Sequence, residues 1–157
     1  MDGSFKTGLS FGITSGIITT LGLMVGLESS TNSRLAVIGG VLVIAIADAL
    51  SDALGIHISE ESEKKSDKSI WESTLSTFVS KFIIALTFIV PLLIFSLQTA
   101  VIISVLWGLL LLGLLSFSIA KSKGANPLKA ISEHITIAVV VVIITFFLGK
   151  AINYIFS

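Results

Sequence analysis

Long runs of uncharged apolar residues are the feature that most constrains how this chain can fold. The longest run, Phe82–Ala120, contains no charged side chain and is about twice the roughly 20 residues that one helix needs to cross a bilayer core. Of the 157 residues, 54% are hydrophobic and 13% are charged, whereas a soluble domain carries about 25% charged residues. The sequence therefore predicts an integral membrane protein of the all-α class.

Breaks between the apolar runs predict five transmembrane helices in one domain over residues 1–157. Pro91 and the Ser96–Thr99 turn divide the longest run, and Lys121–Pro127 is a loop by its Gly, Asn and Pro residues. The helices are expected at about 8–27, 35–59, 75–97, 99–120 and 129–156, with a short charged segment at 59–74.

The distribution of lysine and arginine predicts how these helices are oriented. Five spans place the two termini on opposite sides, and the side that carries the N-terminus also carries most of the basic residues. The other side has only Arg34 and Lys150. Because basic residues collect in cytoplasmic loops, we expect the N-terminus and the 59–74 segment in the cytoplasm and the C-terminus outside. This pattern predicts a multi-pass protein of the cytoplasmic membrane.

Composition excludes several kinds of chemistry. The chain has no cysteine, which excludes disulfides and thiolate metal sites. Its net charge is zero, so nothing indicates a nucleic-acid partner, and no motif indicates a bound cofactor. Metal or proton chemistry in this chain would depend mainly on oxygen ligands.

Two carboxylates interrupt the second apolar run. Asp48 and Asp52 are four residues apart and share one face of a helix, and Asp48 lies about ten residues, or roughly 15 Å, from the expected cytoplasmic end. A carboxylate at membrane depth costs a few kcal/mol and usually faces a bundle interior or a water-lined cavity. We therefore predict that the pair binds a cation or shares a proton. The alternative is a structural pair, either hydrogen-bonded across a helix interface or closer to the headgroups.

The same helix continues into further potential ligands. A histidine and three glutamates follow near its cytoplasmic end: His57, Glu60, Glu61 and Glu63. Residues at i, i+3 and i+4 can present imidazole and carboxylate to one ion, so we predict an acidic mouth that collects metal. The alternative is a solvated helix extension, in which Lys64 and Lys65 pair with the glutamates four residues earlier and His57 caps or snorkels.

Small residues recur along the first predicted helix. They step by three or four positions: Gly8, Gly12, Ser15, Thr19, Gly22 and Gly26. Such a stripe lets helix backbones approach closely in lipid, so we expect helix packing here and contact between the first helices of two copies. Lys81 is expected to snorkel to the interface, and Trp71 and Trp107 are expected to face the interface or lipid.

Paired membrane aspartates also occur in two enzyme classes. Intramembrane aspartyl proteases carry theirs on separate helices with a GxGD motif, which this chain lacks. CDP-alcohol phosphotransferases need a glycine four residues before the first aspartate, where this chain has Ile44. No Ser–His–Asp set or phosphate-binding loop stands out either, so no enzymatic activity is predicted.

Taken in order, these segments resemble the vacuolar iron transporter family, the Fe²⁺/Mn²⁺ carriers of vacuoles and their prokaryotic relatives. Gly12–Leu27 (GITSGIITTLGLMVGL) is similar to the family's first-helix motif, and Ala47–Glu63 (ADALSDALGIHISEESE) is similar to its second. Pro91 resembles the family's third-helix proline step, and Ala100–Gly149 resembles its last two helices. The resemblance covers nearly the whole chain and implies a five-helix fold with a cytoplasmic N-terminus.

Several ligand positions of that family differ in this chain. Ser15 stands where the family has a metal-binding aspartate, and Asp52 stands where it has a metal-binding methionine. Asp48 takes a usually small, uncharged position, and His57 replaces a tyrosine. The family's long cytoplasmic metal-binding helices are cut to the 59–74 segment. Without the methionine thioether, the ligands of the site are expected to be hard oxygen atoms. Such ligands suit Mn²⁺, Mg²⁺ or Ca²⁺ and still allow Fe²⁺.

The resemblance implies a transporter that exports a divalent cation such as Fe²⁺ or Mn²⁺ from the cytoplasm, in exchange for protons. It also implies a homodimer with the path at the two-fold axis, so the expected partners are lipid, metal ions, protons and a second copy. The alternative, favoured by Ser15, is a non-transporting scaffold or metal sensor of the same fold. For transport, Asp48 and Asp52 should face the same cavity as Gly12, Ser15 and Thr19. If they instead pair with Lys81 or a backbone group, transport loses its main support.

Overall fold

The computed structural model describes residues 3–156, which form helices joined by short connections. Six helices follow one another: α1 (Gly3–Thr31), α2 (Arg34–Ser62), α3 (Asp67–Thr87), α4 (Ile89–Ile94), α5 (Leu97–Ser122) and α6 (Pro127–Phe156). Helices α3 and α4 together form one span, Asp67–Ile94, so that five helices are long and apolar enough to cross a membrane. The predicted all-α architecture with five spans is confirmed, and the side that each terminus faces stays a prediction.

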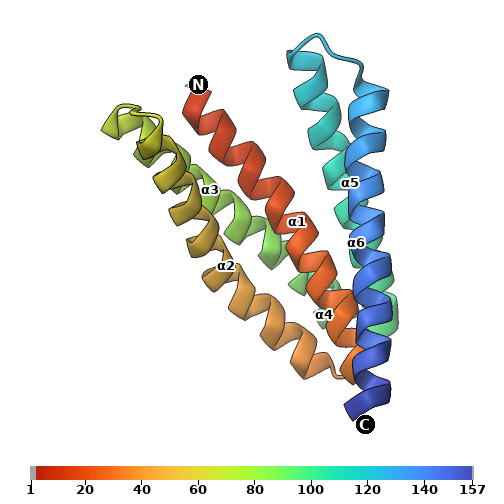
Figure 1. Cartoon of the computed structure of the whole chain (residues 1–157). Helices are drawn as coiled ribbons and strands as arrows, with labels where there is room; N and C mark the ends of the chain where they lie inside the picture. The colour runs from red at the N-terminus through yellow and green to blue at the C-terminus, as the bar shows by residue number, and fades with distance from the viewer. Residues whose placement is uncertain (1–2, 157) are drawn as a thin grey trace.

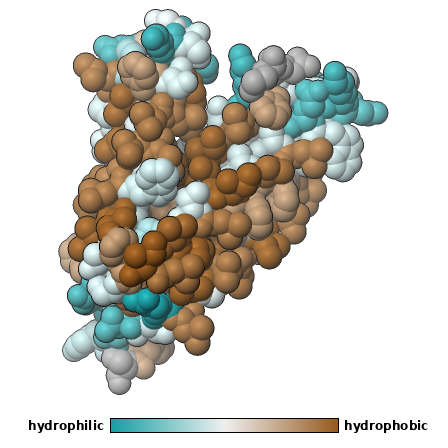
Figure 2. All heavy atoms as spheres, turned by 180° about the vertical axis from the view of Figure 1, so that it is seen from behind, coloured by the Kyte–Doolittle hydropathy of each residue, from teal (hydrophilic) through white to brown (hydrophobic). Residues whose placement is uncertain are grey.

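The helices form two groups that share α1. Figure 1 shows α2 and α3 on one side of α1 and α5 and α6 on the other, with the two termini at opposite ends of the molecule. The two groups meet near the C-terminal end of α1 and diverge toward its N-terminal end. Figure 2 shows hydrophobic residues over the middle of the molecule and hydrophilic residues gathered at its two ends. This distribution suits a molecule whose middle faces lipid tails.

Helix boundaries coincide with turn and breaker residues of the sequence. Pro91 has no backbone N–H to donate to the carbonyl four residues earlier, and α3 ends at that residue, Thr87. The side chains of Ser33 and Ser66 accept backbone hydrogen bonds at the starts of α2 and α3, as N-cap residues do. Gly124 has a φ of 65° between α5 and α6, a conformation that glycine adopts without strain.

The charged segment at 59–74 is mostly helical. Helix α2 continues to Ser62 and α3 begins at Asp67. Lys64 has a φ of 56°, so the chain has left the right-handed helix and the four-residue spacing no longer brings side chains together. The predicted pairs of Lys64 and Lys65 are therefore wrong. Lys65 instead contacts Glu60 at 3.0 Å and Glu63 at 3.1 Å.

Glycines of α1 pack against α3 of the same chain. Gly8 and Gly12 are buried, and a Cβ atom at either position would overlap the facing hydroxyl of Ser76 or Ser80. The absent side chains let the two helices approach closely, and Thr77 Oγ1 donates a hydrogen bond to the Gly8 carbonyl at 3.2 Å. The predicted packing role is confirmed. The predicted contact between two copies through Gly8 and Gly12 is wrong, because α3 already occupies that face.

Candidate functional site

Asp48 and Asp52 of α2 meet a lysine of α3 where these helices pack against α1. Lys81 Nζ lies 2.6 Å from Asp48 Oδ2 and 2.5 Å from Asp52 Oδ2. The Ser15 hydroxyl of α1 accepts a hydrogen bond from Lys81 Nζ at 2.9 Å and donates one to Asp52 Oδ2 at 2.6 Å. We call these four residues the charged cluster. The structure thus brings together three residues that the sequence analysis named, around a fourth that it placed elsewhere.

Lys81 does not snorkel, contrary to the sequence prediction. Its side chain is 2% exposed, because α3 begins at Asp67 rather than near residue 75. Lys81 therefore lies about 14 residues, or about 21 Å, from the start of its helix. Asp48 lies about as far from the end of α2 at Ser62, and the two helices run in opposite directions. The ammonium and the carboxylates consequently meet at the same depth.

The charged cluster holds two carboxylates and one ammonium. Lys81 offsets the repulsion between Asp48 and Asp52, and Ser15 supplies further hydrogen bonds. Buried ion pairs need such close geometry and extra bonds to compensate for lost hydration. This pairing is the outcome that the sequence analysis named as removing the main support for transport, since an internal cation occupies the point where the two carboxylates converge.

One chain does not fully enclose these carboxylates. The side chain of Asp48 is 30% exposed and that of Asp52 is 21% exposed. The flank of α2 that carries them is therefore partly open at membrane depth. Because a charge facing lipid tails is unfavourable, this flank requires either water or another protein surface to cover it.

The predicted acidic mouth divides into separate contacts. His57 Nδ1 lies 3.0 Å from Thr74 Oγ1, and its ring packs edge-on against Trp71 with 5.0 Å between the centroids. Glu60 was expected to be solvated, but it is 3% exposed because Ser73 Oγ donates a hydrogen bond to it at 2.8 Å. His57 and Glu60 therefore hold α2 against α3 through different partners.

The remaining two glutamates of the mouth, Glu61 and Glu63, lie exposed at the end of α2. The carboxylates of Glu60 and Glu63 hold the pKa of Lys65 above its ordinary value of 10.5. Within residues 3–156, no group of three or more His, Asp or Glu side chains could hold a metal ion. The roles of the mouth residues and of the charged cluster as metal ligands stay predictions.

Sequence reasoning named Lys81 as a possible partner of the aspartates but missed that it lies at their depth. The sequence predicts an interfacial position for it because it directly precedes the long uncharged run that begins at Phe82. The available signal was charge balance, since two carboxylates at membrane depth require a compensating cation. Lys81 is the basic residue inside the predicted third helix, 75–97, and could have been chosen on that ground.

No protein-family model matches this chain, and no curated protein matches it at a significant level. The resemblance to the vacuolar iron transporter family therefore stays a prediction from sequence motifs.

Proposed function

We propose that this protein is a membrane transporter that exports a divalent cation of the Fe²⁺/Mn²⁺ type from the cytoplasm, in exchange for protons. The observation that supports it is that Asp48 and Asp52 place two carboxylates side by side at membrane depth with their side chains still 30% and 21% exposed. Carboxylate oxygens are the ligands that hard divalent cations prefer. In this proposal the Lys81 ammonium fills the site between transported ions.

Lys81 is suited to leave the site, because its ammonium is a compact charge on a flexible four-carbon stem. A divalent cation between Asp48 and Asp52 balances both carboxylates, so the positive charge of Lys81 is then in excess. An uncompensated charge in a poorly hydrated interior is unfavourable. One positive charge should therefore leave the site as the metal enters. This charge balance is the basis for the proposed exchange.

The proposed path begins at the molecular end where α2 and α3 are connected. The lysine and arginine distribution argues for a cytoplasmic location of this end. Glu61 and Glu63 are exposed there and would raise the local cation concentration, over a distance limited by a Debye length of about 8 Å. They would collect metal without selecting it.

The proposed transporter is a homodimer, and its second copy covers the open flank of the charged cluster. The outward face of α2 carries small exposed residues at a four-residue spacing, Ala47, Ser51 and Gly55, which favours close helix approach in lipid. A Cβ atom at Gly55 would meet nothing within 4 Å, so this face has room for a partner. Asp48 and Asp52 directly follow two of these residues and would be shielded by a partner helix.

A second candidate function is a non-transporting membrane scaffold or metal sensor. Two observations favour it. Lys81 already lies within 2.6 Å of Asp48 and Asp52 without a metal ion, and Ser15 stands where the resemblance to the vacuolar iron transporters implies an aspartate. In that case the charged cluster holds α1, α2 and α3 together and does not exchange ions.

Ion flux into liposomes separates the two functions. Purified protein would be reconstituted and assayed with Fe²⁺, Mn²⁺, Ca²⁺ and Na⁺, with and without a pH gradient. We expect divalent-cation flux that a pH gradient alters, and we expect Asp52→Asn to lower that flux. Glu133→Gln is the matched control, because Glu133 is an exposed carboxylate that pairs with Lys129 at 4.0 Å and lies outside the cluster. A folded protein that moves none of these cations would overturn transport and favour the scaffold.

A further inference from the structure

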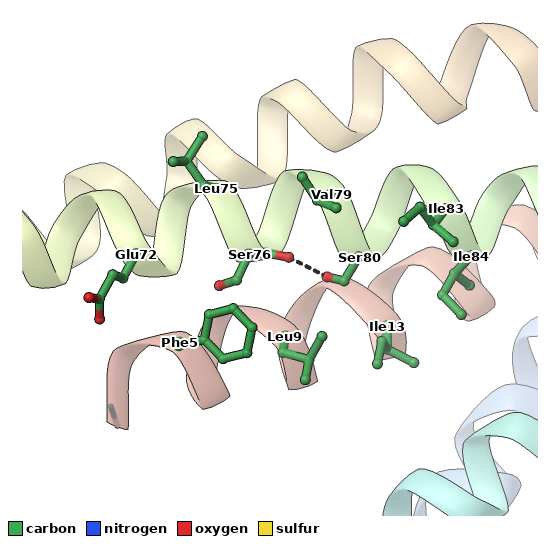
Figure 3. A pocket seen from close by; sticks show the side chains of 10 residues that line it. All are labelled: Phe5, Leu9, Ile13, Glu72, Leu75, Ser76, Val79, Ser80, Ile83 and Ile84. Atoms are coloured by element: carbon green, nitrogen blue, oxygen red, sulfur yellow. Dashed lines mark hydrogen bonds between the residues drawn. The ribbon is translucent and has the colours of Figure 1, made fainter. Parts of the chain in front are cut away.

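An apolar groove runs along the outer surface between α1 and α3. Its volume is about 510 Å³, and no residue of α2 lines it. The walls are mainly aliphatic and aromatic side chains, including Phe5, Leu9, Ile13, Leu75, Val79 and Ile83. Figure 3 shows them along the two neighbouring helices, with Glu72 at the end beside the start of α1. The groove is therefore apolar along its length and acidic at one end.

Glu72 has one carboxylate oxygen that lacks a donor. Its Oε1 lies 3.7 Å from Nζ of Lys68, one turn earlier on α3. Its Oε2 is buried and has no hydrogen-bond partner in the part of the chain that the structure describes. A carboxylate oxygen without a donor is unfavourable, and the side chain of Glu72 is 29% exposed, so the carboxylate indicates a ligand that brings an N–H or O–H group.

The neighbouring residues place Glu72 at the level of the lipid headgroups. Trp71 is 56% exposed, and exposed tryptophans of transmembrane helices favour the membrane–water interface. Lys68 lies one turn further from the membrane centre, with its side chain 80% exposed. In the other direction the groove continues to Ile84, about 12 residues or about 18 Å along α3. Its polar end therefore faces headgroups and its apolar length faces acyl chains.

We propose that this groove binds phosphatidylethanolamine. One acyl chain lies along the walls formed by Leu9, Val79 and their neighbours, and the primary ammonium donates a hydrogen bond to the carboxylate of Glu72, whose side chain is 29% exposed. The phosphate lies near Lys68, whose ammonium is largely exposed. The two charges of the headgroup thus meet the two opposite charges at the end of the groove.

The chemistry of Glu72 discriminates among membrane lipids. An unpaired acceptor oxygen needs a donor, and ethanolamine carries N–H groups, whereas choline has none. An anionic headgroup would bring like charge to Glu72, which is unfavourable. A soluble amine with an apolar tail would satisfy the carboxylate but would leave Lys68 without a phosphate.

Competitive lipid binding tests this assignment. Delipidated protein in mild detergent would receive equal amounts of phosphatidylethanolamine and phosphatidylcholine with identical acyl chains, and native mass spectrometry would count the bound lipids. We expect wild type to prefer phosphatidylethanolamine by about fivefold, as one charge-assisted hydrogen bond at a partly solvated site allows. Glu72→Gln should abolish the preference. Glu133→Gln, which removes the carboxylate of another exposed i,i+4 pair, should retain it.

A groove-filling variant and a competing amine complete the test. Val79→Phe, a change at a side chain that is 48% exposed, fills the groove and should lower the binding of both lipids. Dodecylammonium should compete weakly, because it lacks the phosphate. Equal binding of the two lipids by wild type, a preference that survives Glu72→Gln, or tight binding of dodecylammonium in place of the lipid would each overturn the proposal.

Discussion

At the scale of single residues, Lys81 supplies the positive charge that offsets the repulsion between Asp48 and Asp52. Lys81→Met leaves two carboxylates facing each other, so we expect the free energy of unfolding to fall by about 3 kcal/mol. This is the lower end for a broken buried pair, because the side chains of Asp48 and Asp52 are 30% and 21% exposed. Thermal unfolding in detergent measures the change. Adding Asp48→Asn and Asp52→Asn should restore most of the loss, and an unchanged midpoint for Lys81→Met would refute the stabilising role of the pairs.

Asp52 and Asp48 are expected to contribute unequally to metal binding. Asp52 contacts both Lys81 and Ser15, whereas Asp48 contacts Lys81. We expect Asp52→Asn to weaken Mn²⁺ binding by about tenfold or more, equal to about 1.4 kcal/mol, and to flatten its pH dependence. Asp48→Asn should weaken binding less, and Asp52→Met should shift the preference toward Fe²⁺. Calorimetric titration across pH measures the Mn²⁺ affinity of each variant. If both asparagine variants bind Mn²⁺ with the affinity and pH dependence of wild type, the aspartates are structural.

At the scale of secondary-structure elements, the contact between α1 and α3 requires glycine. Gly12→Ala places a methyl group against Ser80 and Thr77, and overpacking of this kind is destabilising by about 1–3 kcal/mol. Gly113→Ala is the matched control, because a Cβ atom there would meet nothing within 4 Å and alanine favours helix by up to about 1 kcal/mol. Unfolding midpoints should therefore move in opposite directions. A stabilised Gly12→Ala variant would contradict the close packing.

The turn between α2 and α3 should respond to alkaline pH. Glu60 and Glu63 raise the pKa of Lys65 above 10.5 in the folded protein, so its ion pairs stabilise the turn fully below the unfolded pKa. This contribution is lost as the pH rises through the higher folded pKa. We expect the difference in unfolding midpoint between wild type and Lys65→Met to shrink from about pH 9 to about pH 12. A constant difference over this range would argue that Lys65 acts only through packing.

At the scale of the whole molecule, the choice of dimer face is open to direct test. The chain has no native cysteine, so single cysteines can be introduced cleanly. We expect Ser51→Cys on the exposed face of α2 to cross-link two copies in membranes, and Ser104→Cys, whose side chain is fully buried, to remain uncross-linked. Gel mobility without reductant reads the result. A cross-link through Ser15→Cys but not through Ser51→Cys would show that α1, and not α2, lies at the two-fold axis of the dimer.

The sequence by itself determined the class of this protein and most of its boundaries. Uncharged runs longer than a bilayer core permit little besides membrane-spanning helices, and Pro91 and Gly124 act on the backbone of their own segments. These properties are local, so they can be read along the chain. The four-residue spacing of Asp48 and Asp52 likewise fixed their common helix face.

Only the tertiary structure decided what those aspartates face. Lys81 is far from them in sequence, and its depth depended on where α3 begins, which the separation of a charged segment at 59–74 placed several residues too late. The glycine stripe of α1 predicted close packing but could not name its partner, because small residues fit α3 and a second copy equally well. Which residue becomes a partner depends on the relative positions of three packed helices. The residue pattern of any single helix does not specify those positions.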